Sequence, residues 1–141
     1  MYLLDTNVVS ELRKARSGKA DAHVTAWANA VPAGSLFLSA IVVQELEIGV
    51  LLAERRDPSQ GAVLRAWLDD QVLHYFINRI LPVDTAVARH GAAMHVPDPR
   101  PFADALIAAT ALVHGMTLVT RNVDDFALTG ARLLNPWTAS A

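Results

Sequence analysis

Met1-Tyr-Leu-Leu-Asp5-Thr-Asn7 opens the chain as a short apolar run that stops on a carboxylate. Residues 2–4 are too apolar for a strand with one face in water, so they predict a strand inside a parallel sheet. Thr6 or Asn7 would cap the helix that follows. Asp5 would then lie at the carboxyl end of the strand, where open α/β sheets bind their ligands. Asp5 alone decides little, because it is equally explained as a helix cap.

Turn and capping residues divide the rest of the chain into alternating strands and helices. We expect further strands at residues 36–38, 80–83, 117–120 and 132–134. We expect helices at residues 8–14, 22–27, 40–56, 60–76, 85–94 and 102–114. Strands separated by helices predict an α/β fold with a parallel sheet covered on both faces. With no repeat and no long linker, residues 1–141 predict a single domain.

Composition limits the class of protein. A chain of 141 residues can bury a core, and its 52% apolar and 18% charged content argues against disorder. No apolar stretch is long and uncharged enough to span a bilayer, and Asp5 comes too early for a secretory signal. The absence of cysteine excludes disulfides and thiolate metal sites. We expect a cytoplasmic protein that does not act at a membrane.

Glu45 is the second acid of interest. It lies within the expected helix 40–56 on the same row as Ile41, Ile48 and Leu52. A carboxylate buried on an apolar row must be neutral, paired or bound to a cation. The alternative is a residue at the edge of the apolar stripe that reaches water.

Asp104 is the strongest single candidate. Residues 102–113 contain no other charge and are apolar all round, which is typical of a buried helix. The helix dipole stabilises an acid in the first turn by roughly 0.3–1 kcal/mol. Burial of an unpaired carboxylate costs several kcal/mol, so a cation partner is the better explanation.

A fourth acid follows the strand 117–120, where Asp124 and Asp125 compete for the role and an ordinary polar loop is the alternative. Carboxylates crowded together repel one another and need a counter-charge. Mg²⁺ or Mn²⁺ would supply it, because both ions prefer oxygen ligands. The five histidines lie away from these acids in the sequence, which disfavours zinc.

Four short motifs in order along the chain resemble PIN-domain ribonucleases, and most of all the toxins of bacterial VapC/FitB-type toxin–antitoxin pairs. They are Leu-Leu-Asp5-Thr-Asn7, Leu-Ser-Ala-Ile-Val-Val-Gln-Glu45-Leu, Ala-Asp104-Ala-Leu-Ile-Ala-Ala-Thr-Ala and Val-Thr-Arg-Asn122-x-x-Asp125-Phe. The terminal Asn135-Pro136-Trp137 is also similar to that subgroup.

The resemblance implies a three-layer fold with a mostly parallel five-stranded sheet in the order 3-2-1-4-5, flanked by helices. It implies that Asp5 and Asp104 are the main metal ligands, with Glu45 and Asp125 completing the catalytic acids directly or through water. Residues around them would orient ligands and waters, namely Thr6, Asn7, Ser39, Thr120 and Asn122. Some relatives carry Asp in place of Asn122, which leaves the number of metal ions open.

The implied activity is hydrolysis of RNA by a metal-activated water, with Mg²⁺ or Mn²⁺ as cofactor. The resemblance also implies a homodimer and a small antitoxin that blocks the acidic pocket, with DNA bound only through the antitoxin. Arg121, Arg13 and Lys14 are candidate contacts to the RNA backbone. For the basic cluster around Arg13, a solvated helix end is the simpler interpretation.

Two other functions remain to be weighed. A phosphotransferase with Asp5 as nucleophile usually needs an acid two residues later, where this chain has Asn7, and a late lysine, whereas its only lysines are Lys14 and Lys19. A non-catalytic PIN-like module in a DNA-binding toxin–antitoxin repressor complex would not need a complete acid set.

Overall fold

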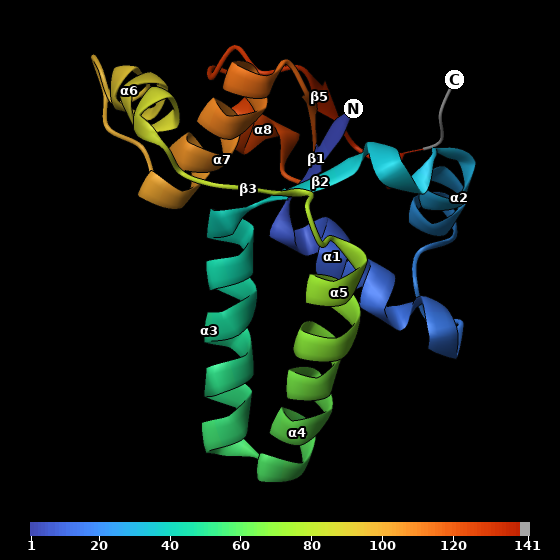
Figure 1. Ribbon diagram of the computed structural model, residues 1–141. Helices are drawn as coiled ribbons and strands as arrows, with labels where there is room; N and C mark the ends of the chain where they lie inside the picture. Colours follow the sequence, from blue (N-terminus) through green and yellow to red (C-terminus); the bar gives the residue numbers. More distant parts are fainter. Residues whose placement is uncertain (139–141) are drawn as a thin grey trace.

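A parallel sheet forms the centre of the computed structural model, which describes residues 1–138. Its strands follow the order β3-β2-β1-β4-β5, and every pairing is parallel (Figure 1). This confirms the expected α/β class and strand order. The strands are β1 (Tyr2–Leu4), β2 (Leu36–Ser39), β3 (Ile80–Leu81), β4 (Thr117–Val119) and β5 (Leu133–Leu134). The end of the predicted domain, residues 139–141, lies outside the described part.

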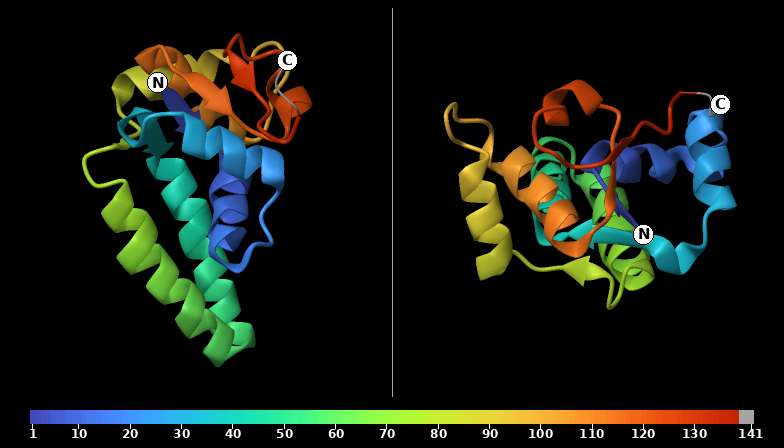
Figure 2. Two further views of the ribbon diagram at one scale, coloured as in Figure 1. Left: turned by 90° about the vertical axis from the view of Figure 1, so that its right-hand side faces the viewer. Right: turned by 90° about the horizontal axis from the view of Figure 1, so that it is seen from above.

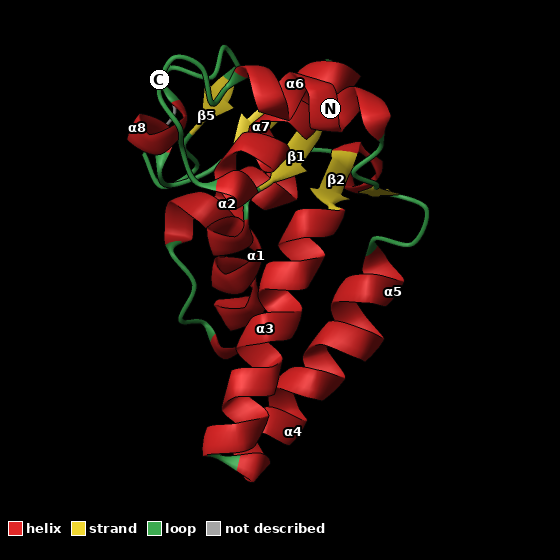
Figure 3. Cartoon of the chain, turned by 90° about the vertical axis from the view of Figure 1, so that its left-hand side faces the viewer, coloured by secondary structure: helices red, strands yellow, loops and turns green. Residues whose placement is uncertain are grey.

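Helices cover both faces of the sheet (Figures 1 and 3). One face carries α6 (Thr85–Ala93) and α7 (Phe102–His114), and the other carries α1 (Thr6–Leu12), α3 (Ala40–Arg56) and the helical run that follows α3. The remaining helices are α2 (Ala22–Ala30), α4 (Pro58–Ala66), α5 (Leu73–Tyr75) and α8 (Val123–Phe126), with 3-10 turns at Arg13–Ser17 and Ala33–Ser35.

The helix expected at residues 60–76 differs in detail from the structure. It begins at Pro58, because Asp57 accepts hydrogen bonds from the backbone N–H groups of Ser59 and Gln60. A π-helical turn at Trp67–Val72 joins α4 to α5. The third strand ends at Leu81, two residues before the expected end.

The core lies where β1 and β4 meet the helices on each face. Leu3, Leu4, Leu118 and Ile107 are fully or almost fully buried there. Small side chains on α7 allow close packing on two sides: Ala108 and Ala111 belong to the core, and Ala105 and Ala109 lie beside Gly91 of α6. Within residues 1–138 no helix has both the length and the apolar content needed to cross a membrane.

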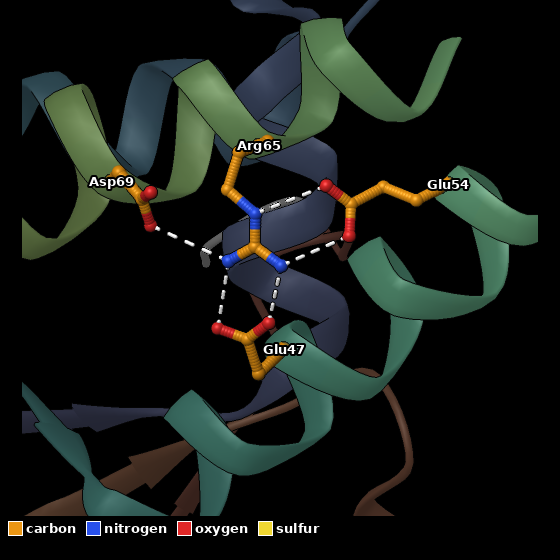
Figure 4. A network of polar contacts seen from close by, with 4 residues as sticks. All are labelled: Glu47, Glu54, Arg65 and Asp69. Carbon is orange, nitrogen blue, oxygen red and sulfur yellow. Dashed lines mark hydrogen bonds and ion pairs between the residues drawn. The ribbon is translucent and has the colours of Figure 1, made fainter. Parts of the chain in front are cut away.

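The helices α3 and α4 form a hairpin that extends away from the sheet (Figure 2). Arg65 of α4 holds it together through both oxygens of Glu47, at 2.9 and 2.6 Å, and both oxygens of Glu54, at 3.3 and 3.1 Å (Figure 4). Asp69 adds an ion pair at 3.6 Å. These carboxylates raise the pKa of Arg65 further above its ordinary value, so the guanidinium remains charged.

Candidate active site

Asp5 is fixed between the two central strands. Its backbone N–H donates to the carbonyl oxygen of Val119 at 2.9 Å, which places it at the carboxyl end of both β1 and β4. Its Oδ1 accepts from the backbone N–H of Thr6 at 2.8 Å, so Asp5 itself caps α1. The prediction that Thr6 or Asn7 caps this helix is wrong, because a carboxylate at the strand end reaches the first free amide. The side chains of Thr6 and Asn7 are therefore available for other contacts.

The second oxygen of Asp5 is held by the end of β4. Thr120, which is fully buried, donates its hydroxyl to Asp5 Oδ2 at 2.8 Å and accepts from the backbone N–H of Asn122 at 3.0 Å. Asn7 donates its side-chain N–H to Asp5 Oδ2 at 3.4 Å and accepts from the backbone N–H of Arg121 at 3.2 Å. The carboxylate is thus oriented from two sides.

Glu45 reaches the same region from α3. The Thr6 hydroxyl donates to Glu45 Oε1 at 2.6 Å, which links the first turn of α1 to α3. The expectation that Glu45 lies on a buried row is wrong, because Ile48 is 48% and Leu52 58% exposed. The core-facing row of α3 consists of Val42, Leu46, Val50 and Ala53. Glu45 is half-buried at the edge of that face, as the alternative interpretation has it.

Asp104 lies in the first turn of α7 and is half-buried. The expected burial of this helix on all sides is wrong near both ends, since Phe102 is 76% and Leu112 36% exposed. The pKa of Asp104 is raised, first by partial burial and then by the negative charges of Asp5, Asp125 and Glu45. Acids from three other segments of the chain therefore lie close enough to Asp104 to affect its charge.

The pKa of Asp5 is also raised above its ordinary value. Burial is the main cause, the hydrogen bonds from Thr120 and the Thr6 N–H oppose it, and the charge of Asp125 adds to it. Asp125 lies on α8 and raises the pKa of both Asp5 and Asp104, whereas Asp124 contributes to neither shift. Of the two candidates for the fourth acid, Asp125 is therefore the one whose charge affects Asp5 and Asp104.

Ser39 and Asn122, two of the residues expected around the acids, make hydrogen bonds away from the carboxylates. Ser39 is fully buried, and its hydroxyl accepts from the backbone N–H of Ile41 at 3.0 Å, which caps α3. Asn122 donates its backbone N–H to Thr120, while its side chain is exposed. Among the described residues, neither side chain hydrogen-bonds to one of the four acids.

The basic residues proposed to contact RNA differ in their surroundings. Arg13 lies over the ring of Trp67 at 5.9 Å, and Lys14 pairs with Glu11 at 3.1 Å, both on the turn after α1. Arg121 directly follows Thr120 and lies over the ring of Trp137 at 5.2 Å. No motif or spacing in the sequence indicates the contact between Arg121 and Trp137.

The four acids offer only carboxylate oxygens, the donors that Mg²⁺ and Mn²⁺ prefer. The raised pKa values of Asp5 and Asp104 mean that their negative charge is not fully compensated by neighbouring groups. As the side chains lie, no three acidic or histidine residues between 1 and 138 are close enough to enclose an ion. Mg²⁺ commonly takes one or two carboxylates and keeps several waters, so the donor set still fits such an ion.

Comparison with known proteins points in the same direction. The family model described as PIN domain matches residues 2–131. The chain is 37% identical to the VapC ribonuclease Y4jK of Sinorhizobium fredii, over 97% of this chain and 98% of that protein. It is 36% identical to Toxin FitB of Neisseria gonorrhoeae, over 97% of this chain and 99% of that protein.

Two solved structures are similar over nearly the full length. The structure of FitAB bound to an IR36 DNA fragment is 34% identical with a TM-score of 0.87, covering 100% of this chain and 99% of that chain. The crystal structure of FitAcB from Neisseria gonorrhoeae is 35% identical with a TM-score of 0.86, covering 99% and 100%.

Proposed function

This chain belongs to the PIN-domain family, and we propose that it is a metal-dependent ribonuclease that acts as the toxin of a toxin–antitoxin pair. The observation that carries the proposal is the position of Asp5 at the carboxyl end of β1, beside β4, together with the charges of Asp5, Asp125 and Glu45 that raise the pKa of Asp104. The names of the relatives, a VapC ribonuclease and Toxin FitB, support it.

The proposed cofactor is Mg²⁺, with Mn²⁺ as a substitute, held by Asp5 and Asp104. Glu45 and Asp125 would complete the site through the waters of the ion, because Mg²⁺ keeps several of them. When bound, the ion would make a water acidic enough to attack phosphorus and would offset charge on the scissile phosphate. A complete acid set of this kind argues against the non-catalytic alternative.

The surrounding residues then keep the carboxylates in place. Thr120 and Asn7 fix Oδ2 of Asp5, and Thr6 fixes Glu45. Ser39 supports Glu45 indirectly, because it caps the helix on which Glu45 lies. Fixed donors of this kind reduce the reorganisation needed when substrate binds.

RNA cleavage by purified variants tests the proposed activity. Asp5→Asn and Asp104→Asn should each lose nearly all Mg²⁺-dependent cleavage of a mixed RNA substrate. Asp124→Asn is the matched control, because it removes the same charge from the first turn of a helix without affecting the pKa of Asp5 or Asp104. Undiminished cleavage by either site variant, at wild-type melting temperature, would refute the assignment.

We further propose that the chain binds a small antitoxin that blocks the acidic pocket, and that DNA is contacted only through this partner. The similar structures named FitAB and FitAcB support this proposal. Native mass spectrometry of the chain co-expressed with its operon neighbour should show a complex of both proteins. A chain that leaves its neighbour unbound would count against a toxin–antitoxin pair.

A further inference from the structure

Arg121 and Trp137 lie at the same end of the sheet as the acids. Arg121 comes two residues after β4 ends and Trp137 three residues after β5 ends, and these two strands are paired in parallel. The Arg121 backbone N–H donates to Asn7 Oδ1, and Asn7 in turn contacts Asp5. Asn7 thus links the backbone of Arg121 to the carboxylate of Asp5.

The direction of the Arg121 side chain is unexpected for a cation beside four acids. Its guanidinium lies over the Trp137 ring at 5.2 Å, and in the described part of the chain it makes no ion pair or side-chain hydrogen bond. Arg65 and Arg79 differ in this respect. Arg65 forms ion pairs with carboxylates of the helical hairpin. Arg79 donates to the backbone carbonyls of Ala33, Leu36 and Tyr75.

Trp137 provides a fixed platform for this contact. The ring is half-buried and packs against the core, and its backbone N–H donates to Asn135 Oδ1 at 2.9 Å. The adjoining strand end is secured by a hydrogen bond from the Thr120 N–H to the Leu134 carbonyl at 3.0 Å. Hydrogen bonds of the backbone N–H groups therefore hold Thr120 and Trp137 at the adjoining ends of β4 and β5.

We propose that Trp137 positions Arg121 as a clamp for a phosphate of the RNA strand, adjacent to the phosphate that is cut. Stacking occupies the flat face of a guanidinium and leaves its in-plane N–H groups available, and these groups match phosphate oxygens in a bidentate manner. A cluster of acids repels a polyanion, so a fixed cation at the edge of the cluster favours approach of the strand. This inference rests on the proposed ribonuclease function.

Binding of RNA in a non-cleaving background tests the clamp. All proteins carry Asp104→Asn, and a fluorescein-labelled single-stranded 12-nucleotide RNA is titrated at several salt concentrations. Arg121→Ala should weaken binding roughly tenfold or more, as expected for the loss of a hydrogen bond to a charged group. It should also reduce the slope of log affinity against log salt by about 0.7, the effect of one lost phosphate contact on a single strand.

Trp137 variants separate positioning from general structure. Trp137→Leu should weaken RNA binding, whereas Trp137→Phe should retain most of the affinity. If the two residues act as one unit, Trp137→Leu should cause little further loss of affinity in a protein that already carries Arg121→Ala. Arg132→Ala is the control for charge, because Arg132 bonds the Gly115 carbonyl at the opposite end of β4. Melting temperatures identify variants that do not fold.

The results distinguish this inference from the ribonuclease proposal. An unchanged salt slope in Arg121→Ala, or fully additive effects of Arg121→Ala and Trp137→Leu, would overturn the clamp even if the parent enzyme cleaves RNA. Failure of the non-cleaving protein to bind the RNA probe would overturn it as well. If the wild-type protein cleaves no RNA although binding by the Asp104→Asn proteins depends on Arg121 and Trp137 as expected, the clamp is supported and the nuclease function is refuted.

Discussion

The hydroxyl of Thr120 lowers the pKa of Asp5, against the larger effect of burial, which raises it. Replacing Thr120 by Val removes the donor to Asp5 Oδ2 and the acceptor of the Asn122 N–H. Loss of these buried partners should lower the free energy of unfolding by about 1–3 kcal/mol. The pKa of Asp5 should rise further, because this hydrogen bond favours the charged form. Urea unfolding and an NMR titration of the Asp5 carboxyl carbon measure the two effects.

Thr117→Val is the control for this change, because Thr117 lies at the opposite end of β4. It should leave the pKa of Asp5 unchanged. An Asp5 titration that is the same in Thr120→Val as in the wild type would show that the hydrogen bond does not determine the charge of the acid.

Asp104 makes the metal-free protein less stable as the pH rises. Its pKa is higher in the native state than the ordinary value of about 3.9, so between these two values the native state holds more protons than the unfolded chain. The free energy of unfolding therefore falls as the pH rises through this range. We expect Asp104→Asn to melt at a higher temperature than the wild type at pH 7 in EDTA, with the difference shrinking towards pH 4.

Asp124→Asn again provides the comparison, since it also removes an acid from the first turn of a helix. Thermal melts of the three proteins between pH 4 and 8 give the result. An Asp104→Asn protein less stable than the wild type at pH 7 would mean that neighbouring groups already compensate the charge.

Single residues were predicted best where a charge interrupts an apolar segment. Asp5 and Asp104 stand out in this way, and the structure brings both to the end of the central strands. For Glu45 the sequence leaves a buried row and the edge of the apolar stripe open, and the structure has it at the edge, because α3 carries apolar residues on both its core face and its exposed face. Its actual partner, the Thr6 hydroxyl, comes from a segment 39 residues away and leaves no periodic signal.

At the scale of elements, the α3–α4 hairpin depends on the close approach of two helices. A Cβ atom added to Gly61 would lie 2.4 Å from the Cα of Glu54, a backbone atom that cannot easily move. Gly61→Ala should therefore lower the free energy of unfolding by about 1–3 kcal/mol, the usual cost of overpacking. This loss should occur even though Ala favours a helix by about 1 kcal/mol.

Gly49 is the matched control within the same hairpin. It lies on the exposed side of α3, with nothing within 4 Å of an added Cβ. Gly49→Ala should raise the free energy of unfolding by roughly 0.5–1 kcal/mol through helix propensity alone. Urea denaturation of both variants measures these changes in the free energy of unfolding. Stabilisation by Gly61→Ala would show that the two helices can move apart at little cost.

The sequence predicted most elements but not how they join. In the helix expected at residues 60–76, Leu68, Val72 and Phe76 are buried, whereas Tyr75 is 46% exposed. The π-helical turn between α4 and α5 shifts the register of the helix, and no single residue in this segment indicates it. Strand ends were overestimated because apolar residues continue beyond the last paired position, as at Val83 after β3.

For the whole molecule, strand order came from the family resemblance, because alternating strands and helices fit several orders. That order makes β1 and β4 neighbours and so brings Asp5 next to Thr120, 115 residues later. A non-local contact of this kind is set by packing of the complete sheet.

The oligomeric state is a second property of the whole molecule. Large apolar side chains are exposed on the helical hairpin, namely Ile48, Leu51, Leu52 and Val63. We expect the isolated chain to form a homodimer that buries such a surface, since exposed patches of this kind often mark interfaces. Native mass spectrometry should give twice the chain mass of 15.2 kDa, and a monomer at micromolar concentration would contradict the expectation.

Binding of Mn²⁺, measured by isothermal titration calorimetry, tests most directly whether the acids form a site for a divalent ion. The wild type and Asp124→Asn should bind Mn²⁺ with the same affinity, whereas Asp5→Asn and Asp104→Asn should bind it far more weakly while remaining folded. Equal Mn²⁺ affinity in all four proteins, or no binding by the wild type, would contradict the account.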